Sequence, residues 1–309
     1  MVSLLFVAGL LVAPASAPAP VRFAVVADNR DAPGFASVLQ SLRAIEGGPG
    51  GFLVIPGDLD PAPATAAAID CVLGPGFPWF PAIGNHDFGD AANLEFVRRH
   101  IREGLAGRVR RGPPGSQDTT YSFDAGPVHV AVIDEYWNGL TAAGSEAAGD
   151  ATVVPALRSW LAADLVGSHR PWKLVVGHEP AYPQPDRDLG SGRHLTTSLN
   201  QYPAARDAFW KMLEAHDVGA YLCGHTHRYS RFRPPGSTVW QIDAGQARDG
   251  PFNWRFDAFL VITADRDTLR VDTYRHVHER GRFERTDWLV VRADGSFEEA
   301  GPAALPPRR

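Results

Sequence analysis

The chain of 309 residues is short of cysteine, with only Cys71 and Cys223. So few thiols argue against a disulfide-rich framework and against a zinc site built on cysteine. Each cysteine lies in a stretch that has the pattern of a buried helix or strand. We therefore predict two buried thiols, with a single disulfide in an exported protein as the alternative.

Basic residues are not in excess, because 30 Lys and Arg stand against 35 Asp and Glu, for a formal net charge of −5. This balance lacks the basic footprint of a nucleic-acid-binding protein. The Gly-x-Ser-x-Gly segment of many serine hydrolases is also missing. Nucleic-acid binding and serine-based hydrolysis are therefore disfavoured.

Long hydrophobic runs are missing as well. The apolar run at residues 4–13 is shorter than the roughly 20 residues that span a bilayer. It leads into Ala15-Ser16-Ala17, which fits a secretory cleavage site, although no Lys or Arg precedes the run. We expect residues 1–17 to be a signal peptide and the protein to be exported, either periplasmic or secreted. A disordered cytosolic leader is the alternative.

The sequence does contain a regular alternation of strand-like and helix-like segments. The expected strands cover residues 21–27, 52–56, 79–83, 120–124, 128–134, 173–176, 220–223, 238–243, 258–263, 268–274 and 288–291. The expected helices cover residues 35–46, 62–73, 91–103, 155–166 and 204–215. This order predicts a layered α/β fold with a mainly parallel sheet and a second, more antiparallel sheet from the later strands. We expect one domain over residues 18–309, with a core from about 21 to 264 and a strand-rich C-terminal extension.

Several expected strands end in residues that can bind metals. These endings are Asp28, Gly57-Asp58, Gly84-Asn85-His86-Asp87, Gly177-His178 and Gly224-His225-Thr226-His227. Glycine before a ligand lets the backbone turn sharply and approach an ion closely. Open α/β sheets bind ligands at the carboxyl ends of their strands. The recurrence favours one shared site over a series of unrelated turns.

Carboxylate, amide and imidazole donors without thiolate suit Zn, Fe, Mn or Ni. A shared Asp58 could bridge two ions held roughly 3.5–4 Å apart. His225 and His227 project to the same side of an extended chain, so both can reach one cluster. Two divalent ions against two aspartates leave a positive centre, which suits an anionic phosphate.

Taken in order, these segments resemble the motifs of calcineurin-like metallophosphoesterases. The Gly-Asn-His-Asp and Gly-His-x-His segments are the most specific, and the resemblance runs from about residue 21 to 264. It implies a four-layer α/β/β/α sandwich of two mixed sheets flanked by helices. It also implies a dimetal centre with two divalent or trivalent ions, drawn from Mn, Fe or Zn.

The resemblance implies a role for each matching residue. Asp58 bridges the ions, and the other ligands are Asp28 and His227 on one ion and Asn85, His178 and His225 on the other. His86 contacts the phosphate and assists the leaving oxygen. Asp87 is expected to orient the His86 imidazole.

One position departs from the family pattern. The first motif usually reads Asp-x-His, and here it reads Asp28-Asn29-Arg30; a guanidinium has no lone pair to offer an ion. The tyrosine that purple acid phosphatases place three residues after the bridging aspartate is also missing, since that position is Pro61. Water could replace the missing ligand, Asp60 could substitute, or the Asp28/His227 ion could bind weakly. Arg30 either grips a phosphate oxygen or forms a salt bridge at the rim.

These residues predict a metal-dependent phosphoric ester hydrolase, a phosphatase or phosphodiesterase, in which a metal-bound hydroxide attacks phosphorus. The alternative is a catalytically weak metal-binding protein of the same fold. Near the motif strands, Tyr136, Trp137 and Tyr182 either stack on a substrate or pack beneath loops, and packing is favoured. His194, on the long loop at residues 181–202, is a further candidate for the site.

Overall fold

A computed structural model describes residues 18–30, 32–140, 150–248, 254–277 and 281–301. The predicted signal peptide and part of the loop after Trp137 lie outside these ranges. Every helix within them is too short or too polar to cross a membrane.

The first sheet has seven strands in the order β14-β13-β12-β11-β1-β2-β3. Their bounds are β1 Val21–Val25, β2 Leu53–Ile55, β3 Trp79–Pro81, β11 Ala258–Ala264, β12 Thr268–Val277, β13 Arg282–Arg292 and β14 Phe297–Glu299. Strands β1, β2 and β3 are parallel, whereas β11 pairs antiparallel with the free edge of β1. The expected strands from residue 258 onward therefore complete this sheet, and the prediction that they belong to a second, more antiparallel sheet is wrong for them.

The second sheet also has seven strands, in the order β4-β5-β6-β7-β8-β10-β9. Their bounds are β4 Arg110–Arg111, β5 Tyr121–Ala125, β6 Val128–Val132, β7 Trp172–Val176, β8 Val218–Cys223, β9 Tyr229–Phe232 and β10 Trp240–Ala244. The expected hairpin is present as β5 and β6, and strands β6, β7, β8 and β10 are parallel. Strands β4, β9 and β14 are additions that the sequence did not reveal.

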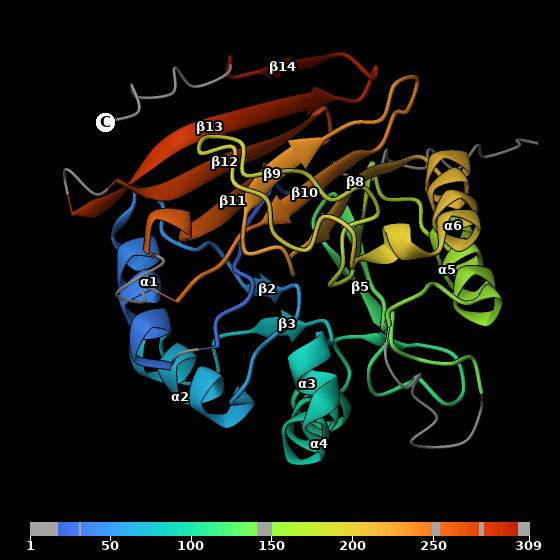
Figure 1. Cartoon of the computed structure of the whole chain (residues 1–309), viewed down its shortest axis with the longest axis horizontal. Helices are drawn as coiled ribbons and strands as arrows, with labels where there is room; N and C mark the ends of the chain where they lie inside the picture. Colours follow the sequence, from blue (N-terminus) through green and yellow to red (C-terminus); the bar gives the residue numbers. More distant parts are fainter. Residues whose placement is uncertain (1–17, 31, 141–149, 249–253, 278–280, 302–309) are drawn as a thin grey trace, which may run out of the picture.

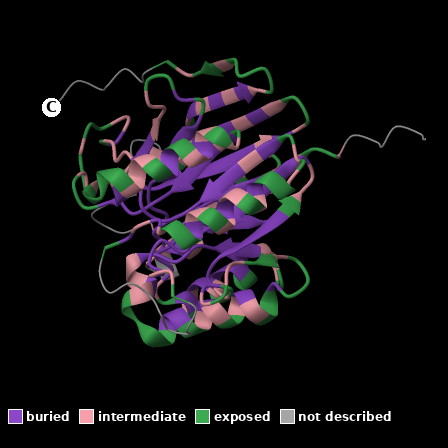
Figure 2. Cartoon of the chain, turned by 90° about the vertical axis from the view of Figure 1, so that its right-hand side faces the viewer, coloured by how far each residue is buried: buried purple, intermediate pink, exposed green. Residues whose placement is uncertain are grey.

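Helices cover the two sheets on their outer faces. Their bounds are α1 Ala32–Ala44, α2 Ala62–Leu73, α3 Asn85–Gly89, α4 Ala91–Arg99, α5 Pro155–Gly167 and α6 Pro203–Ala215, with short η1 His100–Gly104, η2 Leu199–Gln201 and η3 Trp254–Phe256. Figure 1 shows α1 and α2 on one side of the molecule and α5 and α6 on the other. In Figure 2 the strands are largely buried, while the outer helical faces are exposed. The expected four-layer α/β/β/α arrangement of two mixed sheets is confirmed.

Aromatic side chains help to join the two sheets. Phe52, beside β2, stacks on Phe23 of β1 with ring centres 4.6 Å apart. Phe80 of β3 stacks on Phe123 of β5, in the other sheet, at 3.9 Å. Each such buried ring contributes roughly 1.5–3 kcal/mol of hydrophobic stabilisation, so this cluster holds the two motif-bearing sheets together.

The cysteines differ from each other in environment. Cys223, at the end of β8, is buried as predicted, but Cys71 is exposed, and both thiols are free. Helix α2 buries Ala62, Thr65, Ile69 and Val72 among its residues. Cys71 lies off that stripe, so the prediction of a buried thiol there is wrong.

Candidate metal centre

The motif segments of both sheets meet at the carboxyl ends of the parallel strands. Several candidate ligands have left-handed backbone, with φ of 52° at Asp28, 59° at Asp58, 70° at His225 and 56° at His227. This conformation costs a non-glycine residue about 1–2 kcal/mol. Strain gathered at the ends of different strands is typical of a functional site.

The glycines that precede the ligands permit close approach, as predicted. Gly57 has a φ of 83°, and a Cβ there would lie 2.4 Å from Nδ1 of His178. A Cβ on Gly224 would lie 2.5 Å from Oδ2 of Asp28. Side chains at these two positions would push the ligands apart.

Asn85, His178 and His225 converge with Asp58 in what we call the Asn85 half of the centre. The Asn85 Oδ1 atom lies 3.2 Å from Nε2 of His178 and 3.1 Å from Nδ1 of His225. Asp58 Oδ1 lies 3.5 Å from the same His178 nitrogen. Ligands about 2.0–2.2 Å from one ion have such separations.

The outer hydrogen bonds of the two histidines in this half favour a cation between them. His178 donates from Nδ1 to the Pro56 carbonyl at 2.7 Å, and His225 donates from Nε2 to the Thr197 carbonyl at 3.1 Å. When both rings are neutral, each presents a lone pair to Asn85 Oδ1. Three acceptors in contact fit a metal ion, and backbone carbonyls are usual outer partners of ligating histidines.

His178 and His225 have different pKa values in the metal-free protein. Burial lowers the pKa of His178, but Asp58 and Asp28 outweigh it and raise that pKa to about 9. Burial and the neighbouring His178 lower the pKa of His225 to about 3. A cation would therefore replace a proton on His178 and meet an already neutral His225.

Asp28 and His227 form, again with Asp58, what we call the Asp28 half. Ligand atoms of these residues lie within 4.8 Å of one another, so this buried group could hold a metal ion. His227 Nε2 faces Oδ1 of the buried Asp28 at 3.2 Å. Burial raises the pKa of Asp28, but His227 outweighs it and lowers that pKa to about 2.

Arg248, which the sequence did not reveal, contacts the other side of His227. It follows β10 outside any recognisable motif, and its Nη2 donates to Nδ1 of His227 at 2.7 Å. An arginine only donates, so His227 Nδ1 accepts and the ring proton resides on Nε2. Burial lowers the pKa of Arg248.

Arg30 is paired with Asp60. Its Nε lies 2.8 Å from Asp60 Oδ1, and its Nη2 lies 3.5 Å from Oδ2. The two side chains are 27% and 28% exposed, so the pair lies at the rim of the centre. The rim salt bridge is the alternative that this geometry matches.

His86 and Asp87 are adjacent in sequence but differ in exposure and in hydrogen-bond partners. The His86 side chain is 37% exposed, with Nε2 3.9 Å from Asp58 Oδ2. Asp87 is buried, and its carboxylate accepts backbone N–H groups of Asp58, Leu59 and Gly84. No hydrogen bond in the described structure joins Asp87 to the His86 imidazole, and its carboxylate instead links the backbone of the two ligand-bearing loops.

Of the other predicted candidates, one lies close to the centre and three are packed against other parts of the protein. The His194 ring lies 4.5 Å from that of His225 and 6.4 Å from that of His227, so this loop does reach the site. Tyr136 and Trp137 are buried, and the Tyr136 ring stacks on that of Phe88 with ring centres 5.5 Å apart. Tyr182 packs edge-on against Trp210 at 5.0 Å.

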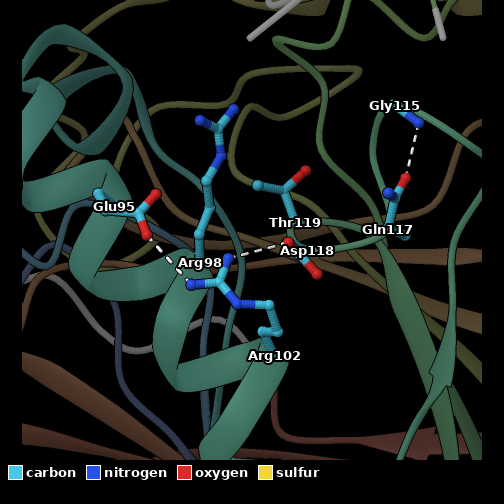
Figure 3. A pocket seen from close by; sticks show the side chains of 7 residues that line it. All are labelled: Glu95, Arg98, Arg102, Gly115, Gln117, Asp118 and Thr119. Carbon is cyan, nitrogen blue, oxygen red and sulfur yellow. Dashed lines mark hydrogen bonds and ion pairs between the residues drawn. The ribbon is translucent and has the colours of Figure 1, made fainter. Parts of the chain in front are cut away.

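A separate pocket of about 140 Å³ lies beside α4. Figure 3 shows Arg102 placed there between Glu95 and Asp118. The ion-pair distances are 3.2 and 3.1 Å. The polar groups of this arginine are already paired, and none of the candidate ligands lines the pocket.

The two mixed sheets, the four-layer arrangement and the buried Asp and His donors define a metallophosphoesterase-type protein. Residues 21–229 match the family model described as calcineurin-like phosphoesterase. The chain belongs to the calcineurin-like phosphoesterase family, whose members typically bind two metals.

Individual relatives are distant. Purple acid phosphatase 21 of Arabidopsis thaliana is 24% identical over 70% of this chain and 46% of its own length. An uncharacterized protein of Mycobacterium tuberculosis is 25% identical over 51% of this chain and 28% of its own length. The chain thus spans less than half the length of these relatives.

Two solved structures share the fold. The structure of PhoD is similar with a TM-score of 0.61 at 12% identity, covering 96% of this chain and 74% of that one. GAP50 of Plasmodium, described as an anchor in the inner membrane complex, is similar with a TM-score of 0.52 at 14% identity, covering 86% and 88%.

Proposed function

We propose that the protein is a metal-dependent hydrolase of phosphoric esters. Family membership supports the reaction class. The observation that carries the proposal is the Asn85 Oδ1 atom held 3.2 and 3.1 Å from two imidazole nitrogens. In the proposed site, Asp58, Asn85, His178 and His225 hold one ion, and Asp28 and His227 join Asp58 at the weaker position.

A bound divalent ion would supply Lewis acidity and lower the pKa of a coordinated water. The protein's own residues orient the ester around it. His86 is exposed beside Asp58, so it can donate a proton or hydrogen bond to the departing oxygen. Arg30 at the rim can bind a phosphate oxygen if it exchanges Asp60 for the substrate.

A catalytically weak metal-binding protein is the second candidate. Two arginines, Arg30 and Arg248, lie around the Asp28 half, where the family pattern expects a histidine ligand. GAP50, which shares the fold, is described as an anchor and not as an enzyme. That likeness concerns the fold alone.

Steady-state hydrolysis separates the candidates. Protein reconstituted with Mn should hydrolyse a nitrophenyl monoester, a bis-nitrophenyl diester or both. The better substrate would distinguish a phosphatase from a phosphodiesterase. An Asn85→Ala variant, prepared in parallel, should lose activity. No turnover of either ester by folded, metal-loaded wild-type protein would favour the second candidate.

We further propose that the protein is exported. The apolar run and the Ala15-Ser16-Ala17 segment support this. N-terminal sequencing of the protein from an exporting bacterial host should find Pro18 as the first residue. Uncleaved protein in the cytosol would contradict export.

A further inference from the structure

The two halves of the centre differ in what lies behind their histidines. His178 and His225 each donate to a backbone carbonyl, which leaves the inner nitrogen free to bind an ion. Behind His227 lies a guanidinium that donates to Nδ1. For His227 to bind an ion through Nε2 as a neutral ring, Nδ1 must carry a proton, and Arg248 opposes that arrangement.

Arg248 is held in place by buried groups. Its Nε and Nη2 donate to Oε1 of Gln246 at 3.3 and 3.2 Å. The Gln246 amide in turn donates to Oδ1 of Asp257 at 2.9 Å, and both Gln246 and Asp257 are buried. This chain of hydrogen bonds fixes the guanidinium against His227.

The Arg248 guanidinium interacts with several charged groups of the centre and its surroundings. Asp28 and Asp257 attract it, and Arg30 and Arg193 repel it, so all four charges lie within electrostatic range of the guanidinium. No carboxylate forms a salt bridge with Arg248 among the described residues. The Arg248 Nη1 atom makes no hydrogen bond to any described residue. Its N–H groups can therefore donate to an incoming anion.

We propose that Arg248 supplies, in the Asp28 half, the positive charge that a second ion would supply. The centre would then hold a single ion in the Asn85 half, and the Arg248 guanidinium would bind an oxygen of the substrate phosphate. This assignment rests on the proposed hydrolysis of phosphoric esters for its substrate. It makes Arg248 a substrate-binding residue and favours a doubly charged monoester phosphate over a singly charged diester.

Metal stoichiometry tests the first part. Metal-free protein titrated with Mn should bind one ion per chain. In the Arg248→Gln variant a second ion should also bind. Its affinity should be at least about tenfold higher than the affinity of the wild type for a second ion. Arg248→Lys keeps the charge and should still bind one ion. Arg233→Gln, a half-buried arginine packed on Trp240, is the matched control and should behave as the wild type.

Phosphate binding tests the second part. Calorimetric titration of the Mn-loaded protein with inorganic phosphate should show about tenfold or more weaker binding in Arg248→Gln. Arg233→Gln should remain within about twofold of the wild type. If Arg248→Gln fails to fold, as judged by circular dichroism, Arg248→Lys and Gln246→Ala carry the test, because Gln246→Ala releases the guanidinium and should weaken phosphate binding.

The outcomes separate this inference from the proposed function. Two ions of similar affinity in the wild type, or phosphate binding unchanged in Arg248→Gln, would overturn the role of Arg248 even if esters are hydrolysed. One ion and Arg248-dependent phosphate binding without ester turnover would support that role and contradict the proposed hydrolysis.

Discussion

The Asn85 half and the Asp28 half contain similar donors but differ in their surroundings. In the Asn85 half, the Pro56 and Thr197 carbonyls accept hydrogen bonds from the outer nitrogens of the histidines. In the Asp28 half, the outer nitrogen of His227 faces Arg248. The family's usual histidine is replaced there by Arg30, which pairs with Asp60.

Short distances between ligand atoms are therefore not enough to rank the metal affinities of the two positions. Asp28, Asp58 and His227 are near enough to hold an ion, yet only the other half has outer partners that fix its imidazoles in the ligating form. Outer partners commonly change metal affinity 10–100-fold, so they decide which position fills first.

Replacing one histidine in each half should give the largest difference in metal content between the two halves. We expect His178→Ala to lose the tightly bound ion and with it at least about 10³-fold in kcat, more than the loss of an outer partner would cost. We expect His227→Ala to retain that ion. Elemental analysis after gel filtration and ester hydrolysis measure both effects; equal metal loss in the two variants would contradict the ranking.

A change at His86 should separate chemistry from metal binding. His86→Ala removes the proposed donor to the leaving oxygen, so kcat should fall roughly 10²–10⁴-fold while the metal content stays unchanged. Ordinary turnover in that variant would remove His86 from the mechanism. The solvent-exposed His169 provides a control, since His169→Ala should leave kcat unchanged.

A change at Arg30 should affect substrate binding at the Asp28 half. Arg30→Ala should raise KM by about tenfold, the size of one charge-assisted hydrogen bond, with little change in metal content. Steady-state kinetics with metal analysis measure both quantities. An unchanged KM would show that Arg30 serves only its salt bridge with Asp60.

Proton release on metal binding should show the smallest effect. In the metal-free protein His178 has a pKa of about 9 and is protonated at pH 7, whereas His225 has a pKa of about 3 and is neutral. The first ion should therefore release about one proton at pH 7, and its affinity should fall roughly tenfold per pH unit as pH drops below 9. Calorimetry in two buffers of different ionisation enthalpy measures the release, and a release near zero would contradict protonation of His178.

The Asn85 half could be predicted from sequence because its residues follow buried strands within specific motifs. Gly-Asn-His-Asp after β3 and Gly-His-x-His after β8 place Asn85 and His225 at the carboxyl ends of strands in the two different sheets. The four-layer fold followed from the same motifs. These signals are local, so the sequence alone reveals them.

The surroundings of the Asp28 half depend on long-range packing. Arg248 reaches His227 because β10 returns antiparallel to β9, with Ala244 opposite Tyr229. Nothing in the spacing of these residues indicates that contact. The placement of β11 beside β1 was likewise hidden, because an antiparallel strand can pair with any free edge.

An anomalous-scattering crystal structure of the protein with Mn tests the central claim most directly. We expect one strong peak surrounded by Asp58, Asn85, His178 and His225, with Arg248 still in contact with His227. A peak confined to the Asp28 half, or two equally strong peaks, would contradict it.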